Sequence, residues 1–185
     1  RMLGSLVDPA RKKVKAAAVV CPHAGYVYSG AVAGAVYSSV EMPGTFVILA
    51  PAHRPQRPAF AIMSEGSWET PLGSVPVDEE LAAAIRAKCP EVVDDPAAHA
   101  AEHSLEVQIP FLQYLRKSPS IVPLNVSARA DFPRLREAGE AIAAAIRESG
   151  KDVLLVASTD MSHYLSAARA KPLDGMLPWP TLIGM

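Results

Sequence analysis

The chain has 185 residues and a mass of 19.6 kDa, which suffices for one domain with a substantial core and is too short for two full domains. Half of the residues are hydrophobic, which excludes a disordered chain. Eighteen basic residues balance nineteen acidic ones and cluster only at 11–15, so nucleic acid and anionic membranes are not expected partners. No apolar run approaches the roughly 20 residues that span a bilayer. With only Cys21 and Cys89 and no secretory pattern, we expect a cytoplasmic protein.

Short apolar runs alternate with longer helical patterns along the chain, which is typical of an α/β domain. In chain order we expect a strand at 16–21, a helix at 31–40 capped by Ser29, a strand at 46–50, a proline-rich loop at 54–76 with a strand piece at 59–63, a helix at 78–88, a helix at 102–115 interrupted by Pro110, a strand at 121–126, a helix at 132–149 and a strand at 153–157. We therefore predict a single layered domain over 1–185, with a central, largely parallel or mixed sheet flanked by helices.

Three of the five histidines come directly after predicted strands. They are His23, His53 and His163, the last accompanied by Asp160. The carboxyl ends of parallel strands open onto one edge of a sheet, so we expect these side chains to converge there. Two imidazoles and a carboxylate form the ligand set of non-haem Fe(II) sites, and they equally suit zinc. Composition and spacing do not choose between the two metals.

Each of these residues also has a structural interpretation. A lone histidine after a strand is often a turn residue, and Asp160 is placed to cap a helix. His99 and His103 would share one helix face if a helix began early, and we expect His99 to be a hydrogen-bonded structural histidine. Serine hydrolysis by Ser158 or Ser162 is disfavoured, because the chain has no G-x-S-x-G motif.

Three aromatic residues are candidates for the walls of a binding pocket. Tyr26 and Tyr28 are two residues apart and would face the same way in an extended chain, and Trp68 is expected on a loop. Covering the core is an equally good role for all three. Cys21 ends a buried strand, which favours an inert core thiol over a metal ligand, and Cys89 has no assigned role. No glycine-rich nucleotide motif is present.

Four separated motifs give the chain a family resemblance. They read PHAGYVYSG at 22–30, WETPLG at 68–73, EHSLEVQIPFL at 102–112 and STDMSHY at 158–164. With these motifs in this order, the chain resembles the Memo family, also called AmmeMemoRadiSam system protein B, over about residues 6–170. This family is related to class III extradiol ring-cleavage dioxygenases, so the resemblance implies a fold of that type.

The resemblance also implies roles for individual residues. His23 and His53 fall where the family places two metal-ligating histidines, and Asp160 and His163 fall at its other pocket positions. His103 belongs to a family motif that lines the pocket or supports it. The implied cofactor is a divalent metal, with Fe(II) expected and copper or zinc as alternatives.

The chain departs from the family pattern in two places. The loop at 49–55 reads LAPAHRP, where the family usually has Gly-Pro-Asn-His before the second ligand. The family's third ligand is a cysteine in a C-terminal stretch, and neither Cys21 nor Cys89 matches it. The apolar segment 177–185 continues no earlier pattern. We therefore expect a domain truncated at both ends relative to the family.

The sequence thus predicts a mononuclear metal site of the extradiol type in a metal-dependent oxidoreductase. Asp160 would be a ligand or orient a histidine, and His163 would act as acid or base toward a small phenol-like substrate. The alternative is a non-catalytic scaffold that binds a peptide or small ligand in the same cleft, with Tyr26, Tyr28 and Trp68 as walls. A truncated product without an intact site is a third possibility.

Overall fold

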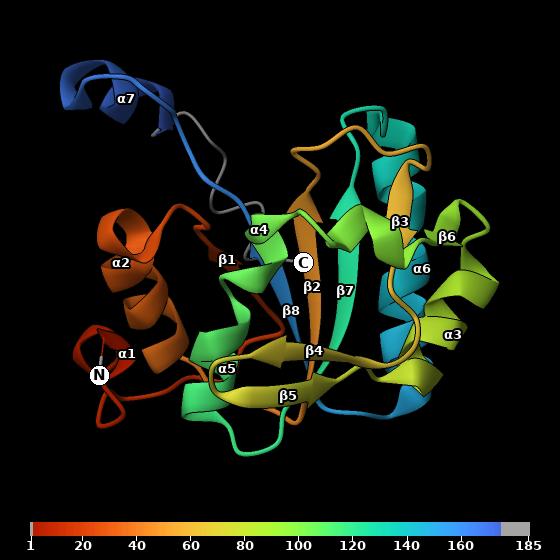
Figure 1. The fold of residues 1–185 in the computed structure, drawn as a ribbon, viewed down its shortest axis with the longest axis horizontal. Helices are drawn as coiled ribbons and strands as arrows, with labels where there is room; N and C mark the ends of the chain where they lie inside the picture. Colours follow the sequence, from red (N-terminus) through yellow and green to blue (C-terminus); the bar gives the residue numbers. More distant parts are fainter. Residues whose placement is uncertain (1, 175–185) are drawn as a thin grey trace.

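The computed structural model describes residues 2–174, so the predicted irregular segment at 177–185 lies outside the described residues. A six-stranded sheet forms the centre, with the strand order β1-β8-β2-β7-β3-β6 (Figure 1). Its strands are β1 Ala18–Cys21, β2 Thr45–Pro51, β3 Phe60–Ile62, β6 Val92–Asp94, β7 Ser120–Val126 and β8 Val153–Ser158. Strands β1, β8, β2 and β7 are mutually parallel, whereas β3 is antiparallel to β7 and parallel to β6. The predicted α/β domain with a mixed sheet is therefore confirmed.

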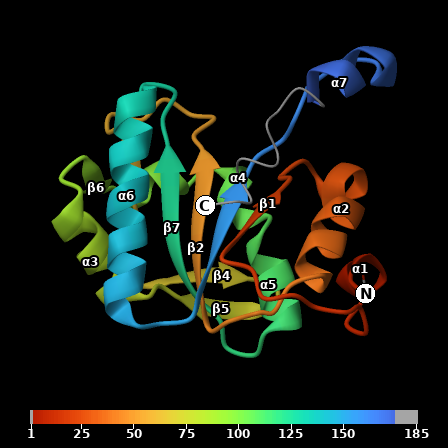
Figure 2. The same cartoon turned by 180° about the vertical axis from the view of Figure 1, so that it is seen from behind.

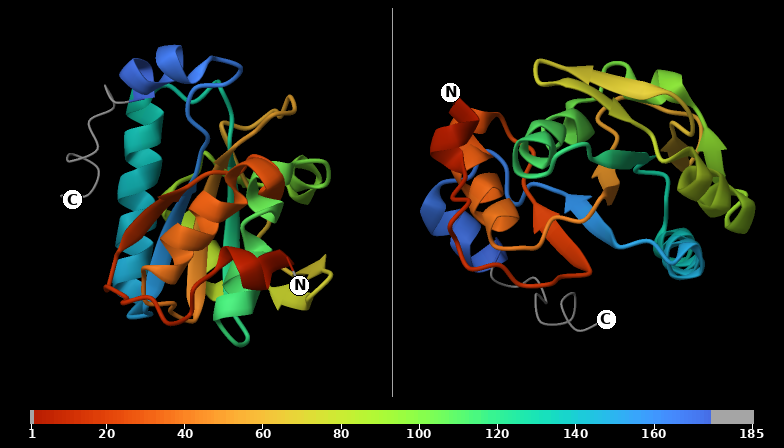
Figure 3. Two further views of the ribbon diagram at one scale, coloured as in Figure 1. Left: turned by 90° about the vertical axis from the view of Figure 1, so that its left-hand side faces the viewer. Right: turned by 90° about the horizontal axis from the view of Figure 1, so that it is seen from below.

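Helices cover both faces of this sheet. On one face lie α1 Met2–Leu6, α2 Tyr26–Ser38, α4 His103–Glu106 and α5 Ile109–Leu115, and α3 Glu79–Lys88 and α6 Phe132–Ser149 lie on the other (Figures 1 and 2). The views in Figure 3 show α6 and α5 on opposite sides of the sheet. Helix α7, Ala167–Asp174, extends away from the sheet in Figure 1. No helix within 2–174 has the length and apolar character that crossing a membrane requires.

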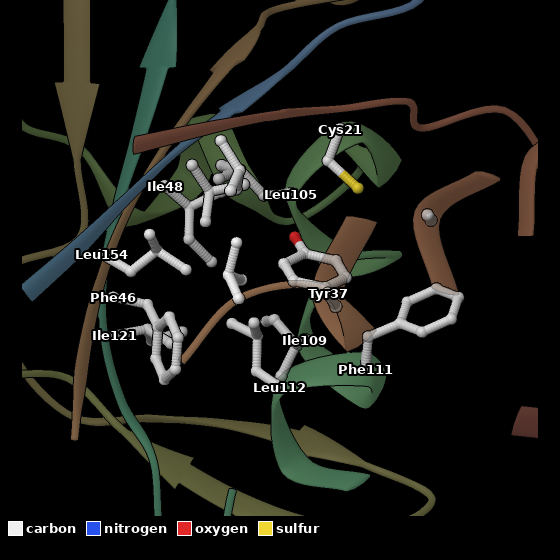
Figure 4. Close-up of a cluster of buried hydrophobic side chains, with 14 of the residues drawn as sticks. Cys21, Tyr37, Phe46, Ile48, Leu105, Ile109, Phe111, Leu112, Ile121 and Leu154 are labelled. Carbon is white, nitrogen blue, oxygen red and sulfur yellow. The ribbon is translucent and has the colours of Figure 1, made fainter. Parts of the chain in front are cut away.

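The alternation of side chains along the strands creates two hydrophobic cores. In β2, Phe46 and Ile48 face the core shared with α2, α4 and α5, while Val47 faces the core shared with α3 and α6. Figure 4 shows the first core, where the Tyr37 ring stacks on Phe111. Because the central strands are buried on both faces, they read in the sequence as continuous apolar runs.

The strongest helix predictions are confirmed, and their boundaries have local causes. Asp78 caps α3 by accepting a hydrogen bond from the backbone N–H of Leu81, and Asp131 caps α6 in the same way. Gly150 ends α6 with φ of 65°, the left-handed conformation that glycine adopts at low cost. Pro110 interrupts the predicted helix at 102–115, because it lies in the first turn of α5 after α4 has ended.

Two local predictions are wrong. The proline-rich segment 54–76 holds β3 and also a two-stranded hairpin, formed by β4 Ser67–Thr70 and β5 Gly73–Pro76. Helix α2 begins at Tyr26 after Gly25, whereas the sequence placed its start near Ser29. The Ser29 hydroxyl lies inside α2 and donates to the Ala24 carbonyl, so it does not cap the helix. Helix α1, strand β6 and helix α7 were not anticipated, because each is short and depends on packing or local turns.

Candidate metal centre

The carboxyl ends of three adjacent strands position the candidate site. β8 lies between β1 and β2, and Cys21 at the end of β1 is in register with Ser158 at the end of β8. His23, His53 and Asp160 each follow their strand by two residues. The rings of His23 and His53 lie 5.3 Å apart between centroids. These two histidines therefore lie close together in the structure, as the sequence predicted.

A third imidazole joins the pair from helix α4, which lies over the end of β2 (Figure 1). The ring centroid of His103 is 4.6 Å from that of His53 and 5.9 Å from that of His23. His23 is buried, whereas the side chains of His53 and His103 remain 42% and 56% exposed. The three rings therefore form a cluster with a buried side and a side open to solvent.

Glu102 anchors the His53 side of the cluster. Its carboxylate accepts from the backbone N–H of His53 at 2.6 Å, from the His53 ring Nδ1 at 2.9 Å and from the backbone N–H of Ser104 at 3.0 Å. Burial would raise the pKa of this carboxyl, yet the hydrogen bonds from Ser104 and His53 lower it to about 2. An ionised carboxylate accepts only, so Nδ1 is the nitrogen that carries the proton when the His53 ring is neutral, and Nε2 then carries the lone pair.

Asp160 holds the loop after β1. Its Oδ1 accepts from the backbone N–H groups of His23 and Ala24, at 2.8 and 3.1 Å. Its Oδ2 lies 3.8 Å from His23 Nε2 and 3.6 Å from His163 Nε2. Asp160 therefore organises two of the predicted residues and leaves one oxygen directed toward their rings. The predicted role as a helix cap does not fit, because both backbone groups that it accepts from belong to the loop after β1.

The buried side of the cluster rests on His23. Its ring Nδ1 lies 3.0 Å from the Ser158 hydroxyl, which also contacts Gln108 and the Ser104 carbonyl. Burial lowers the pKa of His23, and the nearby carboxylate of Asp160 opposes this shift. The buried Ser158 hydroxyl is thus committed to structural hydrogen bonds, which agrees with the low weight given to serine hydrolysis.

The remaining histidines divide between the site and the core. His163 is 56% exposed and lies beside Asp160 at the rim. His99 ends a short 3-10 helix, Pro96–His99, and α4 begins only at His103, so the early helix start that a shared face required is not found. His99 is buried against the Trp68 ring, and burial lowers its pKa to about 4. It is a buried structural histidine, as expected, but neither ring nitrogen has a hydrogen-bond partner among residues 2–174, so the expected hydrogen bond is not found.

The three aromatic candidates occupy different environments. Tyr26 is half-buried, packs edge-on against Phe111 and donates its hydroxyl to the Val107 carbonyl. Tyr28 is almost fully exposed, so the prediction that the two tyrosines face the same way is wrong. The reason is that both belong to helix α2, where residues two apart point in different directions. Trp68 is in strand β4 and packs against both cores.

Cys21 has the environment expected of an inert core thiol. It is fully buried beside Tyr37, as Figure 4 shows. Burial raises the pKa of its thiol to about 12, so the thiolate that a metal needs is disfavoured. Cys89 is buried in the other core, at the end of α3.

The donor set fits a metal ion that prefers nitrogen and oxygen ligands. His53, Glu102 and His103 place one ligand atom each within 4.8 Å of one another. Glu102 already accepts three hydrogen bonds, from two backbone N–H groups and from the His53 ring, so it serves better to orient imidazoles than to bind an ion itself. Imidazoles with one carboxylate suit iron, zinc and copper.

A shallow apolar cavity of about 340 Å³ lies close to the cluster. It opens at the ends of β2, β7 and β8, and Ser158 lines it from the sheet. Its other walls are Leu49–Ala52, Val126–Ala128, Ala130 and Leu135. These walls give the protein a place for an apolar group next to the polar site.

Three residues that support the cluster had no supporting role assigned to them from the sequence, namely Glu102, Gln108 and Ser158, the last of which was considered only as a disfavoured nucleophile. Glu102 directly precedes His103, and this Glu-His pair at a predicted helix start was the available signal. Ser158 is the last residue of a strand, which is the edge where the site was expected. Gln108 carried no signal of its own, because a glutamine in a helical pattern reads as a surface residue.

The fold and the site together define an α/β protein with clustered imidazoles and a carboxylate at the carboxyl end of a parallel sheet core. Residues 1–175 match the family described as Memo-like protein. The chain therefore belongs to the Memo family, as its motifs indicated.

Curated relatives carry the same family name. A MEMO1 family protein of Methanothermobacter thermautotrophicus is 44% identical over 159 residues, which cover 84% of this chain and 57% of the relative. One from Pyrobaculum aerophilum is 47% identical over 148 residues, which cover 78% of this chain and 52% of the relative. One from Archaeoglobus fulgidus is 42% identical over 178 residues, which cover 95% of this chain and 66% of the relative. The chain thus spans between about half and two thirds of the length of these relatives.

Proposed function

We propose that this protein binds one divalent metal ion, Fe(II) in the first instance, through His23 and His53 and acts as a metal-dependent oxidoreductase of the extradiol type. The observation that carries the proposal is the imidazole cluster, in which His23, His53 and His103 lie within 5.9 Å of one another between ring centroids. Hydrophobic packing alone does not draw polar imidazoles together. A shared ligand would explain why three of them meet at this edge of the sheet.

The spacing of Asp160 supports a place for it in the same ligand set. His23 Nε2 and Asp160 Oδ2 are 3.8 Å apart, which is too long for a hydrogen bond. Two atoms that each lie about 2.1 Å from one ion are separated by at most about 4.2 Å. The separation of this pair is within that limit, so both atoms could reach one ion, and the imidazole and carboxylate donors match those of non-haem iron sites.

The chain's own residues would divide the remaining work. A bound divalent ion supplies Lewis acidity and open coordination positions for a substrate and oxygen. Glu102 holds the His53 ring through Nδ1 and so leaves Nε2 for the ion, and the exposed rim would admit a small phenol-like molecule. His163, at the rim and 3.6 Å from Asp160, is placed to take a proton from that molecule and return it to the product.

Metal stoichiometry tests the proposal. The purified chain is loaded anaerobically with Fe(II), desalted and analysed for iron, alongside the His23→Ala, His53→Ala double variant. We expect close to one equivalent of iron in the parent and very little in the double variant. His163→Ala is the matched control, which should keep its iron while losing turnover of a catechol. Equal and negligible iron in parent and double variant would refute the metal site.

The second candidate function is a binding module without chemistry, and the apolar cavity beside Ser158 favours it. In that case the cavity would take an apolar side chain or small ligand independently of any metal. Binding of a fluorescent apolar probe to the His23→Ala, His53→Ala variant distinguishes the two. Unchanged probe affinity together with the absence of bound iron in the parent would favour the binding module.

A further inference from the structure

We propose that Gln108 and Ser158 are positioning residues that hold the neutral His23 ring with its proton on Nδ1, which leaves the lone pair on Nε2, the ring nitrogen that lies 3.8 Å from Asp160 Oδ2. The proton assignment follows from hydrogen bonds alone, and only its consequence for metal affinity rests on the proposed function.

The amide of Gln108 has only one acceptable orientation. Its Nε2 lies 2.9 Å from the Pro22 carbonyl oxygen, which accepts hydrogen bonds and cannot donate. Its Oε1 lies 2.7 Å from the Tyr37 hydroxyl, which donates to it. Exchanging the amide oxygen and nitrogen would place two acceptors against each other at Pro22. The second proton on Nε2 is therefore donated to the Ser158 hydroxyl, at 2.8 Å.

The Ser158 hydroxyl then has one role left toward His23. Its single proton goes to the Ser104 carbonyl oxygen at 2.7 Å, because that oxygen only accepts. One of its lone pairs accepts from Gln108. The other lone pair faces His23 Nδ1 at 3.0 Å, so the ring nitrogen must be the donor.

The opposite tautomer would break this pattern at a buried position. If the Ser158 proton turned toward His23, the Ser104 carbonyl and the Ser158 oxygen would remain 2.7 Å apart as two acceptors. Tyr37, Gln108 and Ser104 are fully buried, and Ser158 and His23 are 2% exposed. Water therefore has little access to replace a lost partner, and an unsatisfied buried group is costly.

In their neutral forms, His23 and His53 consequently carry the proton on the same ring nitrogen, Nδ1, although they are held by different elements. The His53 proton is fixed on Nδ1 by the Glu102 carboxylate, and the His23 proton by a neutral chain through Ser158 and Gln108. The outer hydrogen bonds of metal-ligating histidines fix the tautomer in this way, and their loss typically weakens metal binding 10-fold to 100-fold. Tyr37 belongs to the hydrophobic core and donates to Gln108. Side-chain hydrogen bonds therefore connect the packed core to His23.

Nitrogen NMR of the metal-free chain tests the tautomer directly. The 185-residue chain is labelled with ¹⁵N-histidine, and two-bond ¹H–¹⁵N correlations are recorded at a pH well above the ordinary pKa of histidine. His23 is assigned by comparison with His23→Ala. We expect a protonated Nδ1 and an unprotonated Nε2 for His23. A protonated Nε2 in the parent chain would overturn the inference without recourse to any variant.

Variants then test whether Ser158 and Gln108 cause the preference. In Ser158→Ala and Gln108→Leu we expect the His23 signals to shift toward a mixture of tautomers and Zn²⁺ affinity to fall 10-fold to 100-fold. Ser158→Thr retains the hydroxyl and should restore the tautomer. Ser38→Ala, which removes a buried hydroxyl that accepts from the Asp8 backbone, is the control that should leave both readouts unchanged. Unaltered His23 signals in folded Ser158→Ala and Gln108→Leu would refute the positioning role.

The two hypotheses fail separately. If His23 carries its proton on Nδ1 and the chain binds no metal, the proposed function is wrong and the tautomer assignment holds. If the chain binds metal and His23 carries its proton on Nε2, the positioning inference is wrong and the metal site holds.

Discussion

Replacing Glu102 with glutamine should destabilise the metal-free protein in a way that depends on pH. Glu102 is buried and its carboxylate accepts from two backbone N–H groups and from the His53 ring. Glutamine has nearly the same shape, but one of its two terminal atoms is a donor and would face the donors of His53 or Ser104. The variant therefore removes the charge and sets a donor against a donor without opening a cavity.

The size of the effect follows from the Glu102 pKa. Burial would raise this pKa, but the backbone N–H groups and the His53 ring lower it from 4.5 to about 2. A shift of this size corresponds to about 3 kcal/mol of folding free energy that only the ionised form contributes. Because the pKa of the folded state lies below that of the unfolded state, the stabilisation is complete above about pH 4.5 and is lost as the pH falls toward about 2.

Urea unfolding of the metal-free protein at several pH values measures this difference. At neutral pH we expect Glu102→Gln to unfold with a free energy about 3 kcal/mol lower than the parent, and the gap should close on acidification. Protonated Glu102 carries a donor in the same place as glutamine, so at low pH the parent and the variant should have similar free energies of unfolding. The matched control is Glu106→Gln, an exposed glutamate on the same helix, which should change little. A gap that stays constant with pH, or no gap at neutral pH, would refute this reasoning.

Three further predictions concern the scaffold. Gly34→Ala should lower the free energy of unfolding by about 1–3 kcal/mol, because the added Cβ would overlap the Leu6 carbonyl, whereas Gly139→Ala in an open part of α6 should raise it by about 1 kcal/mol. Thermal melts of both variants test this difference in stability, and equal shifts of the melting temperature in the two variants would contradict it. Asp78→Ala should cost about 1 kcal/mol more than Asp78→Asn in urea unfolding, since asparagine can still cap α3. Cys21, with its pKa raised to about 12, should resist iodoacetamide at neutral pH until urea unfolds the chain, and rapid labelling of the native protein would show that the thiol is not buried.

The sequence predicted the parts of the fold that local patterns encode. Strand β2 and helix α6 were located because an apolar run and a 3.6-residue period are visible without neighbours. The hairpin of β4 and β5 was missed, since its strands are short, half-exposed and surrounded by prolines, and their pairing depends on contact with α5 and β7. The early start of α2 was missed because Gly25 supplies no side-chain cap to recognise.

For the site, the sequence by itself determined that His23, His53 and Asp160 would meet. Their positions after parallel strands fix that meeting once the sheet forms, and the family motifs point to the same residues. Only the tertiary structure decided the rest. His103 enters the cluster from α4, Glu102 and Asp160 each bind backbone groups of a different loop, and Ser158 and Gln108 reach His23 across long sequence separations. Such contacts depend on how helices dock against the sheet edge, and no periodicity in a single chain records that docking.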